Sequence, residues 1–274
     1  MPSTGEAGLL PVLESRALLL VLSLLFCDVS LQLVSKDLEN GILRLKDVPA
    51  AEAFINSTEV AVIGFFQTEA ARGYQEFLSA AARMKALSAA VCGEQQVWAR
   101  YGIASDTISI FRKADLHQEH LNLSEAKKVD ADGLVRFMTM NNVRYVTEYN
   151  QASAVGLFQS EVKTHVLLLA VRGRADSDPL QERFRDLAPK YTGKMLFVLV
   201  NGSEKSNARV LEYFGLGSHD LPRVGIYDGT LDEKWLMPSD DITTERVQTF
   251  CDSFLAGDLQ KQNEAGTPED KTEL

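Results

Sequence analysis

The sequence predicts an α/β protein built from two similar units in tandem. Two short, mainly apolar runs, 59–66 and 164–171, lie about 105 positions apart and are typical of strands buried on both faces. A second pair of matching segments, at residues 100–111 and 213–227, lies about 113 positions apart. Strands that alternate with amphipathic helices in this order indicate a mixed sheet in each unit.

A secretory signal peptide is predicted at residues 1–30. Residues 17–26 are almost wholly apolar and follow Arg16, which matches the hydrophobic core of a signal in length and flank. This run is too short to cross a bilayer, and the later apolar runs are shorter still. The chain is therefore expected to enter the secretory pathway as a soluble protein.

The two units are predicted at residues 39–146 and 147–257. The first is expected to contain, in order, a strand at 59–66, a helix at 73–87, a strand at 108–111 and an amphipathic helix at 131–142. The second is expected to contain a strand at 164–171, a helix at 178–190, strands at 194–200 and 224–227, and a helix at 243–257. Units of this length are ordinary domains.

The C-terminus carries a predicted address for the endoplasmic reticulum. Residues 258–274 are polar, with Gly, Pro and mixed charges, and are expected to form a flexible tail. The tail ends in Lys271, Thr272, Glu273 and Leu274, which resembles the Lys-Asp-Glu-Leu retrieval signal with Thr in place of Asp. Signal and tail together predict residence in the endoplasmic reticulum lumen.

The charge of the chain disfavours some classes of partner. The formal net charge is −10, or −8 without residues 1–30, and Lys and Arg are not clustered. Such a chain is not expected to bind nucleic acid or anionic lipid. A low-affinity calcium buffer is an alternative function, although 38 acidic against 28 basic residues lacks the dense carboxylate runs that buffering requires.

The cysteines and histidines do not predict catalysis. After the signal, the chain keeps Cys92 and Cys251, which lie about 160 positions apart and cannot form a Cys-x-x-Cys redox pair. Cys251 has the helical spacing of a buried residue, and His117 and His120 are expected to face solvent in a turn. We expect no enzyme activity, no cofactor and no metal, and the open alternative is a redox role for one cysteine alone.

The order of elements resembles the thioredoxin fold. The closer resemblance is to the two central, non-catalytic domains of the protein disulfide isomerase family, named b and b′. It covers nearly the whole chain after the signal and is carried by residues 57–66, 161–168, 211–216 and 244–257. It implies two tandem thioredoxin-like domains. In catalytic relatives a thiol pair follows the first central strand, but here residues 67–72 and 172–174 contain no cysteine.

The resemblance implies a peptide-binding groove in the second unit. The positions that match the groove lining of the family are Tyr149, Phe158, Val198, Val210, Tyr213 and Phe214. An apolar groove suits unfolded clients because apolar burial is non-directional. Core packing is the alternative for each residue, since Val198 lies mid-strand and Tyr213 and Phe214 lie at a helix end. Gly229 departs from the larger apolar residue that is expected near the groove.

The resemblance also implies a partner-binding turn. Asp232, Glu233, Lys234 and Trp235 match an acidic and aromatic loop that recruits the catalytic isomerase of the glycoprotein-folding pathway. Lys234 and Leu236 replace acids that are expected in this motif. The tryptophan is either an interface anchor or a core residue.

Three Asn-x-Ser/Thr sequons, at Asn56, Asn122 and Asn201, are candidate N-glycosylation sites. The leading hypothesis for function is a non-catalytic, chaperone-like adaptor that binds unfolded polypeptides and recruits a redox-active protein disulfide isomerase. A lumenal structural spacer that binds no client is the alternative, beside the calcium buffer.

Overall fold

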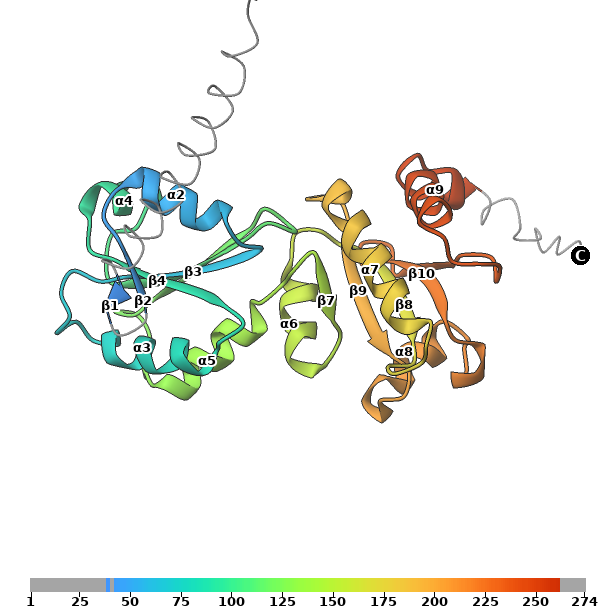
Figure 1. Ribbon diagram of the computed structural model, residues 1–274, viewed down its shortest axis with the longest axis horizontal. Helices are drawn as coiled ribbons and strands as arrows, with labels where there is room; N and C mark the ends of the chain where they lie inside the picture. The colour runs from blue at the N-terminus through green and yellow to red at the C-terminus, as the bar shows by residue number, and fades with distance from the viewer. Residues whose placement is uncertain (1–37, 40–41, 262–274) are drawn as a thin grey trace, which may run out of the picture.

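The computed structural model describes residues 38–39 and 42–261, and these residues form two sheet-containing units that lie side by side (Figure 1). The signal peptide and the retrieval tetrapeptide Lys271 to Leu274 lie outside the described residues. No helix within the described residues is long and apolar enough to cross a membrane.

The first unit contains a six-stranded sheet with helices on both faces. Its strands are β1 (Leu38–Glu39), β2 (Ile42–Leu45), β3 (Val60–Phe65), β4 (Ser88–Cys92), β5 (Thr107–Arg112) and β6 (Gln118–Asn122). Its helices are α2 (Val48–Asn56), α3 (Tyr74–Arg83), α4 (Gln95–Arg100) and α5 (Ala131–Met140). The strand order is β1-β2-β4-β3-β5-β6.

The second unit contains a five-stranded sheet in the order β11-β10-β8-β9-β7. Its strands are β7 (Val146–Glu148), β8 (Thr164–Ala170), β9 (Leu196–Asn201), β10 (Arg223–Asp228) and β11 (Glu233–Leu236). Its helices are α6 (Gln151–Gln159), α7 (Ser177–Leu187), α8 (Ala208–Tyr213) and α9 (Thr244–Leu255), with short 3₁₀ turns η1 (Ala188–Tyr191), η2 (Lys205–Asn207) and η3 (Ser218–Asp220).

The two sheets repeat the same topology. The order β2-β4-β3-β5-β6 in the first unit corresponds to β7-β9-β8-β10-β11 in the second. In each unit the first three of these strands are parallel, and the last two continue antiparallel as a hairpin. The predicted α/β fold with a mixed sheet in each unit is therefore confirmed.

Each sheet is covered on both faces, which explains the unbroken apolar runs of the central strands. All six residues of β3 are buried, as are all residues of β8 after Thr164. In the second unit α7 and α9 cover one face, around Phe184 and Phe250. The other face, formed by α6 and α8, packs Leu157 and Leu211 against the sheet. Burial of these side chains is the main stabilising contribution to both units.

Two sequence-based placements are wrong. The segment that carries Trp235 was expected to be a turn, but Trp235 lies within β11 and the turn ends before it. His120 was expected in a turn with His117, but it lies in β6, where its Nδ1 is 2.8 Å from the Ser109 hydroxyl. In both cases a short edge strand carries too few apolar residues to be recognised from its pattern.

The units meet through α5 and α6, which contact each other directly. Gly156 of α6 makes this close approach possible, because a Cβ atom at this position would overlap the main-chain oxygen of Met140 and crowd Val143. Further contacts join the units. The amide of Gly193 donates to the carbonyl of Ala114 at 2.9 Å, across the predicted boundary between residues 146 and 147.

Candidate functional site

A cavity of about 270 Å³ lies on the face of the second sheet that α6 and α8 cover. It is lined by Tyr149, Leu157, Phe158, His165, Leu167, Val198, Arg209, Val210, Tyr213, Phe214, Tyr227 and Asp232. All six residues that the sequence analysis selected for a groove are among them. We refer to this cavity as the groove.

The α6 helix carries Phe158 at the mouth of the groove. Asn150 and Ser153 form a capping box that fixes the start of the helix, with Asn150 Oδ1 accepting from the amides of Ala152 and Ser153. Leu157 is buried against the sheet, and its neighbour Phe158 remains 52% exposed. An exposed aromatic ring beside an apolar cavity is typical of a binding surface.

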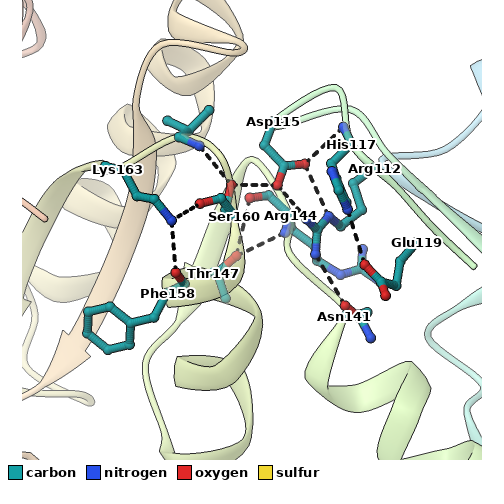
Figure 2. A network of polar contacts seen from close by, with 11 residues as sticks. Arg112, Asp115, His117, Glu119, Asn141, Arg144, Thr147, Phe158, Ser160 and Lys163 are labelled. Carbon is teal, nitrogen blue, oxygen red and sulfur yellow. Dashed lines mark hydrogen bonds and ion pairs between the residues drawn. The ribbon is translucent and has the colours of Figure 1, made fainter. Parts of the chain in front are cut away.

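The end of α6 is held by charged and polar groups from both units (Figure 2). The Lys163 ammonium donates to the carbonyls of Phe158 at 3.2 Å and Ser160 at 2.6 Å. Carbonyl groups at the C-terminal end of a helix have no partner within the helix, and Lys163 supplies one. The Ser160 hydroxyl donates to Asp115 Oδ2 at 2.7 Å. The Phe158 ring points away from this network (Figure 2), so the network supports the helix end without occupying the groove.

Five rings form a continuous wall of the groove, which we call the aromatic wall. Their centroids are 5.6–6.0 Å apart along the series Phe158, His165, Tyr227, Tyr213 and Phe214. Cross-strand pairing brings His165 opposite Tyr227, since the two residues are register partners in β8 and β10. The tilted and edge-to-face ring pairs are arrangements that aromatic rings prefer.

The remaining apolar residues form the floor and the rim. Val198 and Phe214 are 1% and 5% exposed, so each is both a core residue and part of the groove surface. Gly225 makes room for the Phe214 ring, because a Cβ atom there would lie 2.7 Å from its Cε1. Tyr149 and Val210 are half-buried at the rim.

His165 is the buried polar group of the groove, and it was not selected from the sequence. Its side chain is 6% exposed, and Nε2 has no hydrogen-bond partner in the structure. Burial lowers the pKa of this imidazole to about 4, so it is neutral at physiological pH. A buried polar atom without a partner is unfavourable, so the His165 imidazole is a costly component of the groove wall.

The four residues predicted to bind a partner isomerase do not form one exposed surface. Trp235 is 6% exposed and packs edge-to-face on Phe254 at 5.0 Å, within the core between the sheet, α7 and α9. Asp232 lines the groove. Glu233 and Lys234 are exposed, and the Lys234 ammonium contacts the main-chain oxygen of Tyr213.

Both described cysteines are buried and free. Cys92 ends β4, and Cys251 lies on the buried side of α9 as its helical spacing predicted. Burial raises the pKa of both thiols, to about 12 for Cys251, where Asp252 adds to the effect. Among residues 38–39 and 42–261 no three His, Cys, Asp or Glu side chains gather as a possible metal site.

The sequons differ in their surroundings. Asn56 is exposed at the end of α2. Both polar atoms of the Asn122 side-chain amide form hydrogen bonds. Oδ1 accepts from Ser105 and Ser124, and Nδ2 donates to Glu125. Asn201 is half-buried, and its Oδ1 accepts from the amides that follow β8 and β9.

Comparisons with known proteins agree with this architecture. A family model described as a thioredoxin-like domain matches residues 66–253. Endoplasmic reticulum resident protein 27 of Mus musculus is 38% identical over 231 residues, which are 84% of this chain and 85% of the mouse protein. The Homo sapiens protein of that name is 38% identical over 234 residues, with the same two coverages. Protein disulfide-isomerase of Gallus gallus is 31% identical over 219 residues, which are 79% of this chain and 41% of the chicken protein.

The chain belongs to the thioredoxin-like proteins and, within them, to the protein disulfide isomerase family that includes endoplasmic reticulum resident protein 27. The relatives confirm the predicted localisation in the endoplasmic reticulum. They also support a non-catalytic member of the family, and the sequence contains no Cys-x-x-Cys pair.

Proposed function

We propose that the protein is a non-catalytic adaptor that binds unfolded polypeptide segments in the groove and brings them to a catalytic protein disulfide isomerase. One observation carries the proposal. The six side chains expected to bind peptide come from α6, β9, α8, the residue that caps α8 and the segment after β7, and all of them line one cavity.

The dimensions and chemistry of the groove favour an extended chain over a small compact ligand. Its volume of about 270 Å³ is at the low end of the ~300–1,000 Å³ typical of small-molecule pockets. One or two apolar side chains of a client would fill it, while the rest of the client stays outside. Because apolar burial is non-directional, such a groove accepts many sequences.

A partner supplies the redox chemistry in this proposal. Cys92 and Cys251 are buried with raised pKa values, so neither provides the thiolate that attacks a disulfide. A catalytic isomerase of the glycoprotein-folding pathway is the proposed partner. Asp232 and Glu233 are the exposed acids of the predicted partner motif, and we propose that they face the basic surface of this partner.

The test is binding of a fluorescein-labelled, aromatic-rich unfolded peptide, followed by fluorescence anisotropy. Phe158→Ser should weaken binding about tenfold, since a ring that covers part of the client contributes about 1–2 kcal/mol. Leu255→Ser is the matched control, because Leu255 is 45% exposed on α9, away from the groove. Phe158 is already exposed, so its replacement should leave the fold intact.

If a folded Phe158→Ser variant binds the peptide with full affinity, the groove is not the client-binding site. A wild-type protein that fails to bind the peptide would favour the spacer instead.

A further inference from the structure

The turn between β10 and β11 closes one end of the aromatic wall. We call residues 229–234 the strap. They comprise the connection between the two strands and the first two residues of β11, and they contact α8 through Asp232 and Lys234. Asp232 belongs to the strap and also lines the groove. The surface expected to recruit a partner and the surface expected to hold a client therefore overlap at Asp232.

Asp232 holds two tyrosines of the aromatic wall. The Tyr213 hydroxyl lies 3.0 Å from the main-chain oxygen of Asp232 and 3.3 Å from Oδ1. The Tyr227 hydroxyl donates to the same Oδ1 at 3.2 Å. Hydrogen bonds to an ionised acceptor are stronger than those between neutral groups. One carboxylate oxygen thus fixes the positions of rings from two elements, α8 and β10.

Asp232 holds these contacts from an unfavourable backbone conformation. Its φ is 54°, in the left-handed region that non-glycine residues seldom adopt. Such a conformation is less favourable than the ordinary backbone regions and persists where surrounding contacts compensate for it. The contacts with Tyr213 and Tyr227 are available for that compensation.

Lys234 adds a second attachment to Tyr213. Its ammonium contacts the main-chain oxygen of Tyr213 and lies 4.2 Å from the centroid of the Tyr213 ring, over its face. Lys234 is one of the two residues that depart from the expected acidic motif. In this chain the Lys234 ammonium contacts Tyr213 of α8. The lysine therefore attaches the strap more firmly to α8, where an acid would have enlarged an acidic surface.

We propose that the strap holds the aromatic wall in its client-binding geometry, and that a basic partner segment which takes the Asp232 carboxylate loosens the wall and weakens client binding. The inference rests on the proposed function and specifies how the site would be regulated. A guanidinium competes well for this carboxylate, because it forms a charge-assisted pair in place of hydrogen bonds from neutral hydroxyls. By linkage, a bound client must lower the affinity for the basic partner by the same factor.

The first experiment measures binding of the labelled aromatic peptide to the full chain and two variants. Asp232→Ala removes the Oδ1 acceptor that both tyrosines share and keeps the main-chain acceptor of Tyr213, and Asp241→Ala removes an equal charge at an exposed position of the same unit. We expect Asp232→Ala to weaken binding about fivefold and Asp241→Ala to leave it unchanged. The double variant Tyr213→Phe, Tyr227→Phe keeps both rings and removes both hydroxyls. It should weaken binding at least as much as Asp232→Ala, because it also removes the bond from Tyr213 to the main-chain oxygen of Asp232.

The second experiment adds an oligoarginine peptide as the probe for a basic partner. It should weaken client binding to the wild type and leave client binding to Asp232→Ala unchanged. The proposed role of the strap would be wrong if folded Asp232→Ala bound the client as tightly as the wild type. It would also be wrong if Asp241→Ala lost as much affinity as Asp232→Ala. In either case the groove would remain the proposed client site. A wild-type protein without client binding would overturn the proposed function and this inference together.

Discussion

The hydroxyl of Ser160, in the second unit, donates a hydrogen bond to Oδ2 of Asp115, in the first, at 2.7 Å. The two groups are fully shielded from solvent, and the same carboxylate pairs with both Nε and Nη2 of Arg112, at 3.1 and 2.7 Å. A buried ion pair of one unit is therefore completed by the other. Breaking such a pair is costly because it leaves a charge without compensation.

The Ser160–Asp115 bond is expected to contribute measurably to stability. Ser160→Ala should lower the free energy of unfolding by about 1–3 kcal/mol, because a buried acceptor loses its donor. Asp115→Ala should cost about 3–5 kcal/mol by leaving the Arg112 guanidinium unpaired. Urea unfolding followed by circular dichroism measures both changes, with Ser218→Ala at an exposed position as the control. Equal stability of Ser160→Ala and Ser218→Ala would contradict the expectation.

The two described thiols should be unreactive in the folded protein. The thiolate is the reactive form, and burial raises the pKa of both Cys92 and Cys251. A thiol reagent that reports by absorbance should label neither cysteine in native protein that lacks residues 1–30, and both in denaturing urea. Rapid labelling of one thiol in the native state would instead support a redox role for that cysteine.

His165 should make the protein less stable in mild acid. The pKa of this imidazole is about 4 in the folded protein against 6.5 without the surrounding structure, and burial is the main cause. Between these values the unfolded chain binds a proton that the folded chain does not, so the free energy of unfolding falls as the pH falls through this window. The contribution amounts to at most about 3 kcal/mol.

The measurement for His165 is urea unfolding at about pH 7 and about pH 4.5. Carboxylates also titrate in this range, so the informative quantity is the difference in pH dependence between wild type and His165→Phe. That variant should lose less stability on acidification than the wild type. His219→Phe is the control at an exposed histidine and should behave like the wild type. An identical acid response of all three proteins would show that His165 is not a source of the effect.

The three sequons should differ in occupancy. Asn56 presents an exposed amide at a helix end, so a bulky glycan extends into solvent there. At Asn122 and Asn201 the side-chain amide takes part in local hydrogen bonds that support β6 and the ends of β8 and β9. Expression in secretory cells, with glycosidase-dependent mobility as the readout, should show a shift that Asn56→Gln abolishes. A shift abolished only by Asn122→Gln or Asn201→Gln would contradict this assignment.

The sequence predicted the central architecture because the central strands of both units are covered on two faces. That environment favours apolar runs such as residues 60–65 and 166–170, and such runs are visible without any structure. A hairpin was expected in each unit, but its second strand, β6 or β11, was not placed, since exposed positions dominate these strands. The same limit produced the wrong expectation that Trp235 lies in a turn.

The groove residues were selected through the family resemblance, and their exposure could not be read from their types. Phe158 and Phe214 had the same two alternatives, groove or core, yet they are 52% and 5% exposed. His165 and Tyr227 were missed because an isolated polar or aromatic residue in a strand pattern does not reveal its cross-strand neighbour. Their pairing across β8 and β10 follows from the strand register, which is a tertiary property.

The absence of a side chain at Gly156 lets the helices of the two units touch. Because α6 rests directly on the end of α5 there, one added methyl group would force the two units apart. The two units are therefore in close contact here, and the buried Ser160–Asp115 hydrogen bond adds a second contact between them. In solution they should rotate as a single elongated particle.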